Sequence, residues 1–436
     1  MNYYIIALMA IVAVFAQIYI NSVPLNAPPI RSDGQGYYMY LPAYFIYHDP
    51  KMLFLDQVQD VGAFRSTYFL SATGAMVDKY TMGTALLQLP FFLIAHILTS
   101  IVNPSAATGF TEYYQFANGI SAAFYFFVGS CFAYKTTSKY VPKKFAVLAL
   151  MVCTFGSNLF HYATYDASFS HIYSFAMISI FLYWIHLEND YKSDSRSRKA
   201  LFYLLGGAIY GLIILIRVTD ATVILLYLLF SVINKKELKR RVIRLTSPSK
   251  VLFFGAGAVA AFLPQMLHWR VTTGHFLLNS YGETDPGFIY WKTPKILHVL
   301  FLPERGIFFW CPVLLIGLIL GIIWVKRIDN VILCSVVFIA LYIYVIASWH
   351  SYTLAGGYSH RIFVNIMALF ILFTGNGLYG LSKVKDAIKL PIVFLIRVAI
   401  VWNMICMYAY WRCVIGFDHF QLAHAVKIVK WYLHME

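Results

Sequence analysis

Long apolar runs dominate this 436-residue sequence and limit what it can fold into. About twelve runs of roughly 17 to 25 residues are each long enough to cross about 30 Å of hydrocarbon as an α-helix. The runs are continuous and lack the alternation of barrel strands, so helices are predicted. The predicted fold class is therefore all-α, a polytopic transmembrane protein with about 11 to 13 spans. The spans are expected to begin near Tyr3, Thr81, Tyr114, Phe145, Ser170, Leu201, Ala221, Val251, Gly306, Val331, Arg361 and Leu390.

Charge is sparse, and its distribution sets the orientation. The chain is 60% hydrophobic and 12% charged, with a formal charge of +15. The basic residues gather in short connections, which the positive-inside rule places in the cytoplasm beside anionic lipid headgroups. This pattern argues against a nucleic-acid partner. The first run lacks a basic n-region and a cleavage site, so it is interpreted as a retained span. The basic connections are residues 135–144, 192–199, 235–250, 326–327 and 383–389.

The opposite connections are polar and aromatic, and we predict that they face outward. Residues 24–80 form a first outer loop with two interfacial helices, at 37–47 and 52–63. Residues 271–305 form a second long outer loop, and residues 412–436 form a membrane-associated tail. An outer position for the first loop requires that residues 81–113 do not cross the membrane, so we expect a broken or re-entrant segment where Pro90 interrupts the run.

Several polar motifs stand at the predicted outer ends of the spans. The first motif is Ser32-Asp33-Gly34-x-Gly36-Tyr37-Tyr38, directly after the first span. The others follow in order along the chain: Asp78-Lys79-Tyr80-x-x-Gly83, Ser168-x-Ser170-His171, Arg217-x-x-Asp220, Pro303-x-Arg305-Gly306, and Gly356-Gly357-x-Ser359-His360-Arg361. This ordered set resembles the GT-C superfamily of integral-membrane glycosyltransferases, which use polyprenyl-phosphate sugars as donors. Protein O-mannosyltransferases and lipid A aminoarabinose transferases are relatives within it. The first loop lacks a glutamate beside its acid and no large soluble domain follows, so the acceptor cannot be transferred from either relative.

The resemblance implies that Asp33 is the general base that removes the proton of the acceptor hydroxyl. Gly34 and Gly36 would permit a tight turn that points the carboxylate toward the bilayer surface. The alternative is a structural role, with Asp33 as the N-cap of an interfacial helix.

Fixed positive charge is needed to stabilise the departing phosphate. Charges at the outer ends of spans are costly and usually functional or paired. For Arg217, pairing with Asp220 remains an equal alternative. The candidates for binding the donor phosphate are Lys79, Arg361, Arg305 and Arg217.

A further group of polar and aromatic residues on the outer side could contact sugar or acceptor. Aromatic residues at an interface are often membrane anchors, Asp166 could be an exposed turn residue, and His171 could be a satisfied histidine at a helix start. The candidates are Tyr37, Tyr38, Asp78, Asp166, His171, Tyr281, Glu283, Trp291, Trp349 and His360.

The sequence therefore predicts a glycosyltransferase that moves a sugar from a polyprenyl-phosphate donor to a hydroxyl of a cell-envelope glycan, lipid or protein. Its expected location is the bacterial cytoplasmic membrane, with the active site on the outer face. No cofactor or metal site is predicted, although a divalent metal is compatible with the chemistry. A secondary transporter or lipid flippase is the alternative from another class, and a ligase or polymerase using diphosphate-linked glycans is a further one. Six scattered cysteines suggest neither disulfides nor metal ligands.

Overall fold

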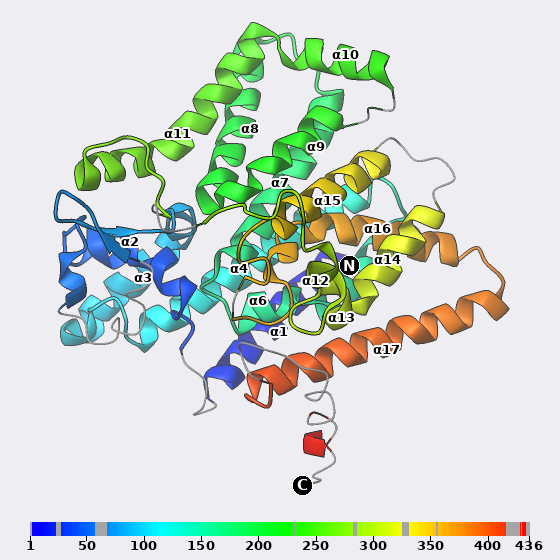
Figure 1. Cartoon of the computed structure of the whole chain (residues 1–436), viewed down its shortest axis with the longest axis horizontal. Helices are drawn as coiled ribbons and strands as arrows, with labels where there is room; N and C mark the ends of the chain where they lie inside the picture. The colour runs from blue at the N-terminus through cyan, green and yellow to red at the C-terminus, as the bar shows by residue number, and fades with distance from the viewer. Residues whose placement is uncertain are drawn as a thin grey trace.

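The computed structural model describes most of the chain and is almost entirely helical. The described residues are 2–22, 28–56, 68–230, 232, 234–281, 286–324, 331–354, 356–415, 428 and 430–432. Within them the fold is all-α apart from one two-stranded hairpin, which confirms the predicted fold class. In Figure 1, α2 and α3 lie together on the left, α8 to α11 rise at the top, and α17 runs along the lower right.

The apolar runs of the sequence form helices. Within the described residues, seven helices are at least 18 residues long and apolar enough to cross a membrane: α1 (Asn2–Asn21), α3 (Gly83–Val102), α4 (Glu112–Thr137), α7 (Ser170–Asp190), α8 (Arg196–Ile216), α11 (Pro248–Thr273) and α17 (Asp386–Trp411). Shorter apolar helices are η4 (Val218–Val223) continued by α9 (Ile224–Leu229), α14 (Pro312–Ile323), α15 (Val331–Ala347) and α16 (Met367–Leu381). The remaining helices in these regions are α5 (Lys143–Gly156), α6 (Leu159–Thr164), α10 (Lys235–Leu245), α12 (Ile296–Phe301), α13 (Ile307–Trp310) and η5 (Arg361–Val364).

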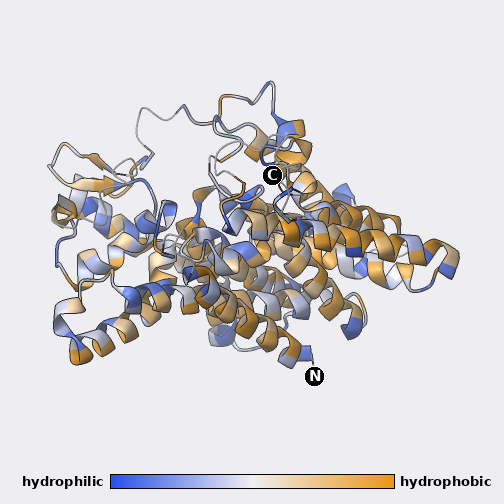
Figure 2. Cartoon of the chain, turned by 90° about the horizontal axis from the view of Figure 1, so that it is seen from below, coloured by the Kyte–Doolittle hydropathy of each residue, from blue (hydrophilic) through white to orange (hydrophobic). Residues whose placement is uncertain are grey.

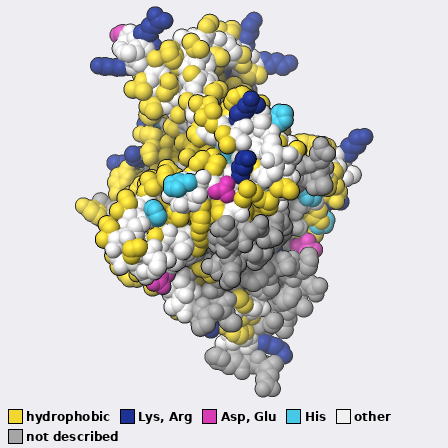
Figure 3. Space-filling view, turned by 90° about the vertical axis from the view of Figure 1, so that its left-hand side faces the viewer, with side chains coloured by type: hydrophobic (Ala, Val, Ile, Leu, Met, Phe, Trp, Pro, Cys, Tyr) yellow, Lys and Arg dark blue, Asp and Glu magenta, His cyan; other side chains and the backbone are white. Residues whose placement is uncertain are grey.

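Polar and apolar residues separate along the molecule. Figure 2 shows hydrophobic residues along most helices and hydrophilic residues mainly at helix ends and connections. In Figure 3, Lys and Arg side chains gather at the upper end, while a broad hydrophobic surface lies below them. Many large apolar side chains are exposed, such as Leu252 at 65% and Phe394 at 65%. An apolar exterior with charged ends is what a bilayer requires of a membrane protein.

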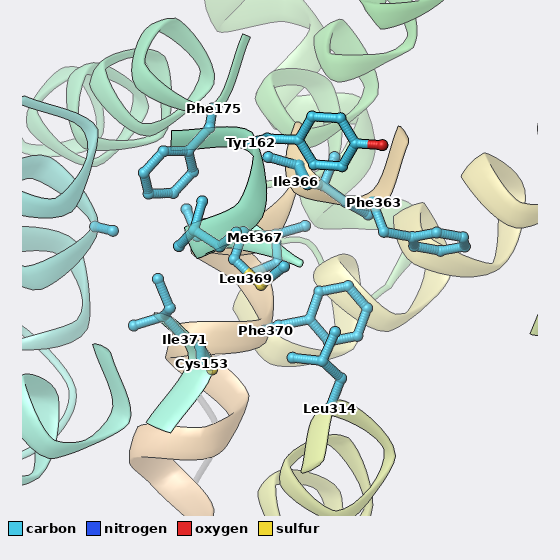
Figure 4. Close-up of a cluster of buried hydrophobic side chains, with 14 of the residues drawn as sticks. Cys153, Tyr162, Phe175, Leu314, Phe363, Ile366, Met367, Leu369, Phe370 and Ile371 are labelled. Atoms are coloured by element: carbon cyan, nitrogen blue, oxygen red, sulfur yellow. The ribbon is translucent and has the colours of Figure 1, made fainter. Parts of the chain in front are cut away.

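The hydrophobic core is centred on α16. Thirteen of its fifteen residues are buried, so the helix is apolar on nearly every side. Figure 4 shows Phe370, Met367 and Ile371 of this helix with Leu314 of α14 and Cys153 of α5. The enclosed position of α16 holds the preceding turn, η5, against the rest of the molecule.

Close contact between α8 and α11 depends on small residues. A Cβ placed on Gly207 would overlap the backbone carbonyl of Phe254, and one on Gly257 would overlap that of Leu204. Small residues of this kind let membrane helices approach closely. The close packing of α8 against α11 keeps together the ends of the two helices that reach the candidate site.

The first outer loop is more enclosed than the sequence suggests. It contains α2 (Asp33–Phe45), η1 (Leu53–Asp56) and a hairpin of β1 (Tyr68–Leu70) with β2 (Met76–Asp78), in the register Tyr68↔Asp78. Residues 34–43 of α2 are buried, so this helix packs within the protein and does not lie open on the interface. Of the second predicted interfacial helix, the structure describes only its beginning, which is η1; residues 57–67 lie outside the described part.

The expectation of a broken segment at Pro90 is wrong, because α3 continues through this proline as one helix. Proline costs one helical hydrogen bond but is tolerated in membrane helices whose neighbours satisfy the freed groups. At its start, Gly83 faces the backbone at the end of α8. Beyond its end, which η3 (Pro104–Ala106) follows, the Gly109 carbonyl accepts a hydrogen bond from Tyr38 of α2 (2.6 Å). The start of α3 and the connection after it therefore both contact elements that the sequence predicts on the outer side.

The second outer loop is joined by backbone hydrogen bonds to the connection after α15. The amide of Tyr290 donates to the Ser348 carbonyl (2.9 Å), and the amide of His350 donates to the Gly287 carbonyl (2.9 Å). The apolar run at 296–302 forms α12. Most of the predicted tail, 412–436, lies outside the described residues.

Candidate active site

Asp33 is the first residue of α2, immediately after the connection from the first span. Ser32 occupies the N-cap position with a φ of 50° and makes no capping side-chain hydrogen bond. The helix then packs very closely: a Cβ on Gly34 would overlap the Ser168 side chain, and one on Gly36 would lie 2.5 Å from the Tyr80 ring. Asp33 is thus held at a fixed helix start but is not itself the N-cap, which was the alternative interpretation.

The carboxylate of Asp33 forms an ion pair with Arg361. Asp33 Oδ2 lies 2.8 Å from an Arg361 guanidinium nitrogen, and the two side chains are 20% and 13% exposed. Burial raises the pKa of Asp33, but Arg361, a hydrogen bond from Tyr80 and the charges of Lys79 and Arg217 outweigh it. The net pKa lies below the ordinary value, so Asp33 is a carboxylate at neutral pH.

Arg217 does not form the ion pair with Asp220 that its sequence spacing suggests. Its guanidinium donates hydrogen bonds to the Tyr37 hydroxyl (3.2 Å) and the Ser170 hydroxyl (3.1 Å). Within the described residues, Asp220 accepts its hydrogen bonds from neutral side chains only. The charge of Arg217 is therefore not neutralised by a direct contact with the nearest acid in sequence.

A cavity of about 520 Å³ brings these groups together. Asp33, Lys79, Arg217 and Arg361 all line it, and so do Trp269 of α11 and aromatic residues from both outer connections. The Trp349 ring lies 4.7 Å from that of Phe288 and 5.9 Å from that of Tyr281, measured between centroids. The described lining thus combines one carboxylate with three cations and an aromatic wall.

The cavity unites seven of the predicted site residues, namely Asp33, Lys79, Arg217, Arg361, Tyr37, Tyr281 and Trp349. Others lie outside its lining: Arg305, Tyr38, Asp78, Asp166, His171, Trp291 and His360. Glu283 falls outside the described residues.

Asp166 belongs to a separate buried network. It pairs with Arg31 (3.1 Å) and with His161 (2.8 Å), and the Arg31 guanidinium lies 4.0 Å from the centroid of the Tyr165 ring. Burial raises the pKa of Asp166, but His161 and Arg31 outweigh it and lower the pKa to about 2. Because Arg31 is two residues before Asp33, this network holds the segment that leads into α2.

Asp78 lies buried beneath the cavity wall. It is 0% exposed, and its Oδ1 accepts the backbone N–H of Tyr80 (2.8 Å). Burial raises the pKa of Asp78 to about 8, so this second acid is mostly protonated at neutral pH. Two acids near the cavity therefore differ in charge, and Asp33 is the ionised one.

The other predicted residues outside the lining make local contacts. Tyr38 donates to Gly109, as described above, and the His360 ring bonds the Tyr352 carbonyl (2.8 Å). The Arg305 guanidinium donates to the Glu304 carbonyl (2.9 Å), and the Trp291 ring stacks on Phe288 at 5.2 Å. His171 contacts Asn365.

Sequence reasoning missed three aromatic lining residues, Tyr80, Trp269 and Phe288. Trp269 lies inside an apolar helix, where nothing in the sequence distinguishes a cavity wall from a lipid contact. Phe288 lies between Tyr281 and Trp291 in the same loop, and this aromatic spacing could have indicated it.

The residues around Asp33 do not fit a divalent metal ion. Asp33 is the one carboxylate of the described lining, and three cations share the cavity with it. Within the described residues, no three His, Cys, Asp or Glu side chains cluster as metal ligands.

Comparison with solved structures shows what this arrangement resembles. The archaeal oligosaccharyltransferase AglB from Archaeoglobus fulgidus, in complex with an inhibitory peptide and a dolichol-phosphate, matches with a TM-score of 0.52 over 96% of this chain and 57% of that one. This chain shares the fold of that archaeal enzyme. The apo form of the same enzyme gives a TM-score of 0.52 over 97% of this chain, and its complex with zinc and sulfate gives 0.51 over 95%.

The likeness concerns the fold alone, since the identity to these structures is 13 to 14%. The chain spans a little over half the length of the archaeal enzyme, 54 to 57%. No family model matches the sequence, and no similar sequence is found among curated proteins.

Proposed function

We propose that this chain is an inverting membrane glycosyltransferase with a polyprenyl-phosphate sugar donor. The acceptor is a hydroxyl of a cell-envelope glycan, lipid or protein, and the reaction takes place at the outer face of the bacterial cytoplasmic membrane. The observation that carries this proposal is the meeting of Asp33 with three cations in one aromatic-lined cavity of a GT-C fold. The archaeal enzyme of the same fold is described with a dolichol-phosphate, which supports a lipid phosphate as the donor group.

The charges of the cavity suit a departing phosphate. A polyprenyl-phosphate sugar carries a single negative charge, and the polyprenyl phosphate released from it gains a second. Asp33 and Arg361 neutralise one another by their ion pair, which leaves the charges of Arg217 and Lys79. Positive charge that is fixed in advance stabilises the transition state because it matches charge that develops as the bond breaks.

Asp33 acts as the base in this reaction. The acceptor oxygen attacks the anomeric carbon, the bond from that carbon to the phosphate oxygen breaks, and the acceptor proton passes to the Asp33 carboxylate. Displacement in a single step inverts the anomeric configuration. When the donor phosphate engages Arg361, the ion pair with Asp33 weakens and the pKa of Asp33 rises toward a value suited to a base.

The aromatic wall and the size of the cavity suit a sugar. A volume of about 520 Å³ lies within the range of small-molecule sites, roughly 300 to 1,000 Å³. Trp349, Phe288 and Tyr281 offer apolar faces on which a sugar ring can pack.

The test is sugar transfer by the purified protein in lipid nanodiscs, with undecaprenyl-phosphate-linked monosaccharides as donors. Asp33→Asn is expected to lose transfer by about 10² to 10⁴-fold, the usual contribution of a general base. Asp386→Asn is the matched control, because that carboxylate is 72% exposed and, among the described residues, forms its ion pair with Lys389 of its own helix. A folded Asp33→Asn protein with full activity would disprove the assignment of the base. Chelation with EDTA is expected to leave the rate unchanged.

A further inference from the structure

Asp220 is a buried acid that the proposed chemistry does not use. It is 0% exposed and lies three residues after Arg217, yet it does not contact that guanidinium. A buried carboxylate without a direct cation is costly unless hydrogen bonds satisfy it fully. The hydrogen-bond partners of Asp220 therefore indicate its structural role.

Three neutral side chains donate to Asp220. The Ser174 hydroxyl of α7 donates to Oδ2 at 2.8 Å, and the Tyr342 hydroxyl of α15 donates to Oδ1 at 3.0 Å. The Asn365 amide spans both oxygens, at 3.0 and 2.9 Å. The acid thus joins α7, η4, α15 and the end of η5.

The Asn365 side chain is held from its other side by His171. The His171 Nδ1 atom lies 2.9 Å from Asn365 Oδ1, and since an amide oxygen only accepts, the ring nitrogen donates. The orientation of the Asn365 amide toward Asp220 is therefore fixed from both ends. His171, one of the predicted sugar contacts, here supports the amide.

Each partner of the Asp220–Asn365 pair is tied to one of the two cavity arginines. The backbone N–H of Asp220 donates to the Arg217 carbonyl at 2.9 Å. Arg361 begins η5, and Asn365 is the residue that ends it. Arg217 is the N-cap of η4 and Arg361 is the first residue of η5, and one half of the pair follows each arginine after three or four residues.

We propose that Asp220 and Asn365 form a buried strut that sets the separation of Arg217 and Arg361 across the cavity. This inference rests on the proposed function, since it assigns both arginines to the donor phosphate. Asp220 and Asn365 are positioning residues, because they lie outside the cavity lining. A carboxylate suits the position because it only accepts and offers about four lone-pair sites, whereas asparagine would turn a donor toward other donors.

The experiment measures donor KM, kcat and the Kd for undecaprenyl phosphate in nanodiscs. Asp220→Asn is expected to raise the donor KM and the Kd by about tenfold and to change kcat much less, because misplaced contacts weaken binding. Asn365→Asp is expected to do the same, since it sets two carboxylates against each other. The exchanged pair, with both substitutions together, restores an amide facing a carboxylate and is expected to recover part of the loss in KM, because one hydroxyl donor still faces an amide nitrogen at position 220.

Two further variants complete the experiment, one as a control and one as a milder test of the same contact. Ser335→Ala removes another buried hydroxyl of α15, which bonds only within its own helix, and is expected to leave KM unchanged. Tyr342→Phe removes a single donor to Asp220 and decides the question if Asp220→Asn does not fold, with an expected rise of about threefold in KM.

The outcomes separate this inference from the function on which it rests. A folded Asp220→Asn protein with the donor KM of wild type overturns the strut alone. An exchanged pair that shows no recovery also overturns it. A wild-type protein that binds no undecaprenyl phosphate overturns the proposed function, and the strut falls with it.

Discussion

Two regions of this molecule each place one carboxylate among three cations, but they are built differently. Near the basic connections, Glu188 of α7 contacts Arg241 at 3.0 Å, Arg244 at 3.2 Å and Lys250 at 3.4 Å, and its side chain is 1% exposed. In the cavity, Asp33 contacts Arg361 directly, while Arg217 and Lys79 line the cavity beside it.

The difference separates a structural cluster from the proposed binding site. The cations around Glu188 converge on the acid itself and tie α7 to α10 and α11, and none of them lines the described cavity. The cavity cations direct their charge toward a space that a ligand can enter. A group of cations around an acid therefore indicates a binding site only where some of those cations do not form an ion pair with the acid.

The largest expected effect comes from Arg361→Gln. This substitution removes a proposed phosphate contact and leaves Asp33 without its ion-pair partner, so kcat/KM for the donor should fall by about 10² to 10³-fold, as for truncation of a hydrogen-bonded charge pair. Steady-state kinetics with a polyprenyl-phosphate sugar measures the loss. A decrease of less than threefold would contradict the proposed role of Arg361 in binding the donor phosphate.

Glu188→Gln should affect stability and not catalysis. Removing the acid leaves buried Arg241 without its ion partner, which we expect to lower the unfolding free energy by about 3 kcal/mol. Thermal unfolding in detergent should detect the change, while kcat/KM per folded molecule stays at the wild-type value. Loss of transfer in a normally stable variant would contradict the comparison.

The pH dependence of the two acids near the cavity should also differ. Burial raises the pKa of Asp33, but Arg361 and its neighbours bring the net value below normal, so the base stays ionised down to acidic pH. In Arg361→Gln the effect of burial is opposed less, and the acid limb of the kcat/KM profile should move to higher pH. An unchanged acid limb would mean that another group is the base.

The smallest effect is expected from Asp78→Asn. Burial raises the pKa of Asp78 to about 8, so its contribution to stability is complete below the unfolded pKa and is lost as pH rises through about 8. The neutral asparagine should therefore resemble wild type near pH 4, gain stability relative to wild type as the pH rises, and be the more stable protein at pH 8. Melting temperatures measured across this range test the sign.

Much of the fold could be predicted because a bilayer imposes a simple rule on sequence. Continuous apolar runs must be helices that cross or face lipid, and basic connections report the side on which they lie. The same reasoning failed at Pro90, because a proline lowers helix stability without saying whether neighbours compensate. It also could not foresee the burial of α2, which depends on packing of distant segments.

The candidate site was predicted in part, because charges at the ends of spans are rare and conspicuous. Asp33, Lys79, Arg217 and Arg361 were each visible in this way. Asn365 was not, because a single asparagine in an apolar run gives no sign of its partner 145 residues away. The spacing of Arg217 and Asp220 even suggested the wrong pairing, since proximity in sequence cannot reveal which donors reach a buried acid.

The aromatic wall of Tyr281, Phe288 and Trp349 has a consequence for the fate of an activated sugar. A transferase must prevent water from taking the place of its acceptor, since water is abundant and also carries a hydroxyl. Apolar rings that exclude solvent from the reacting carbon reduce this side reaction without discriminating against a larger alcohol that displaces them. In the proposed reaction, the rings on which the sugar packs would therefore also protect the lipid-linked donor from hydrolysis.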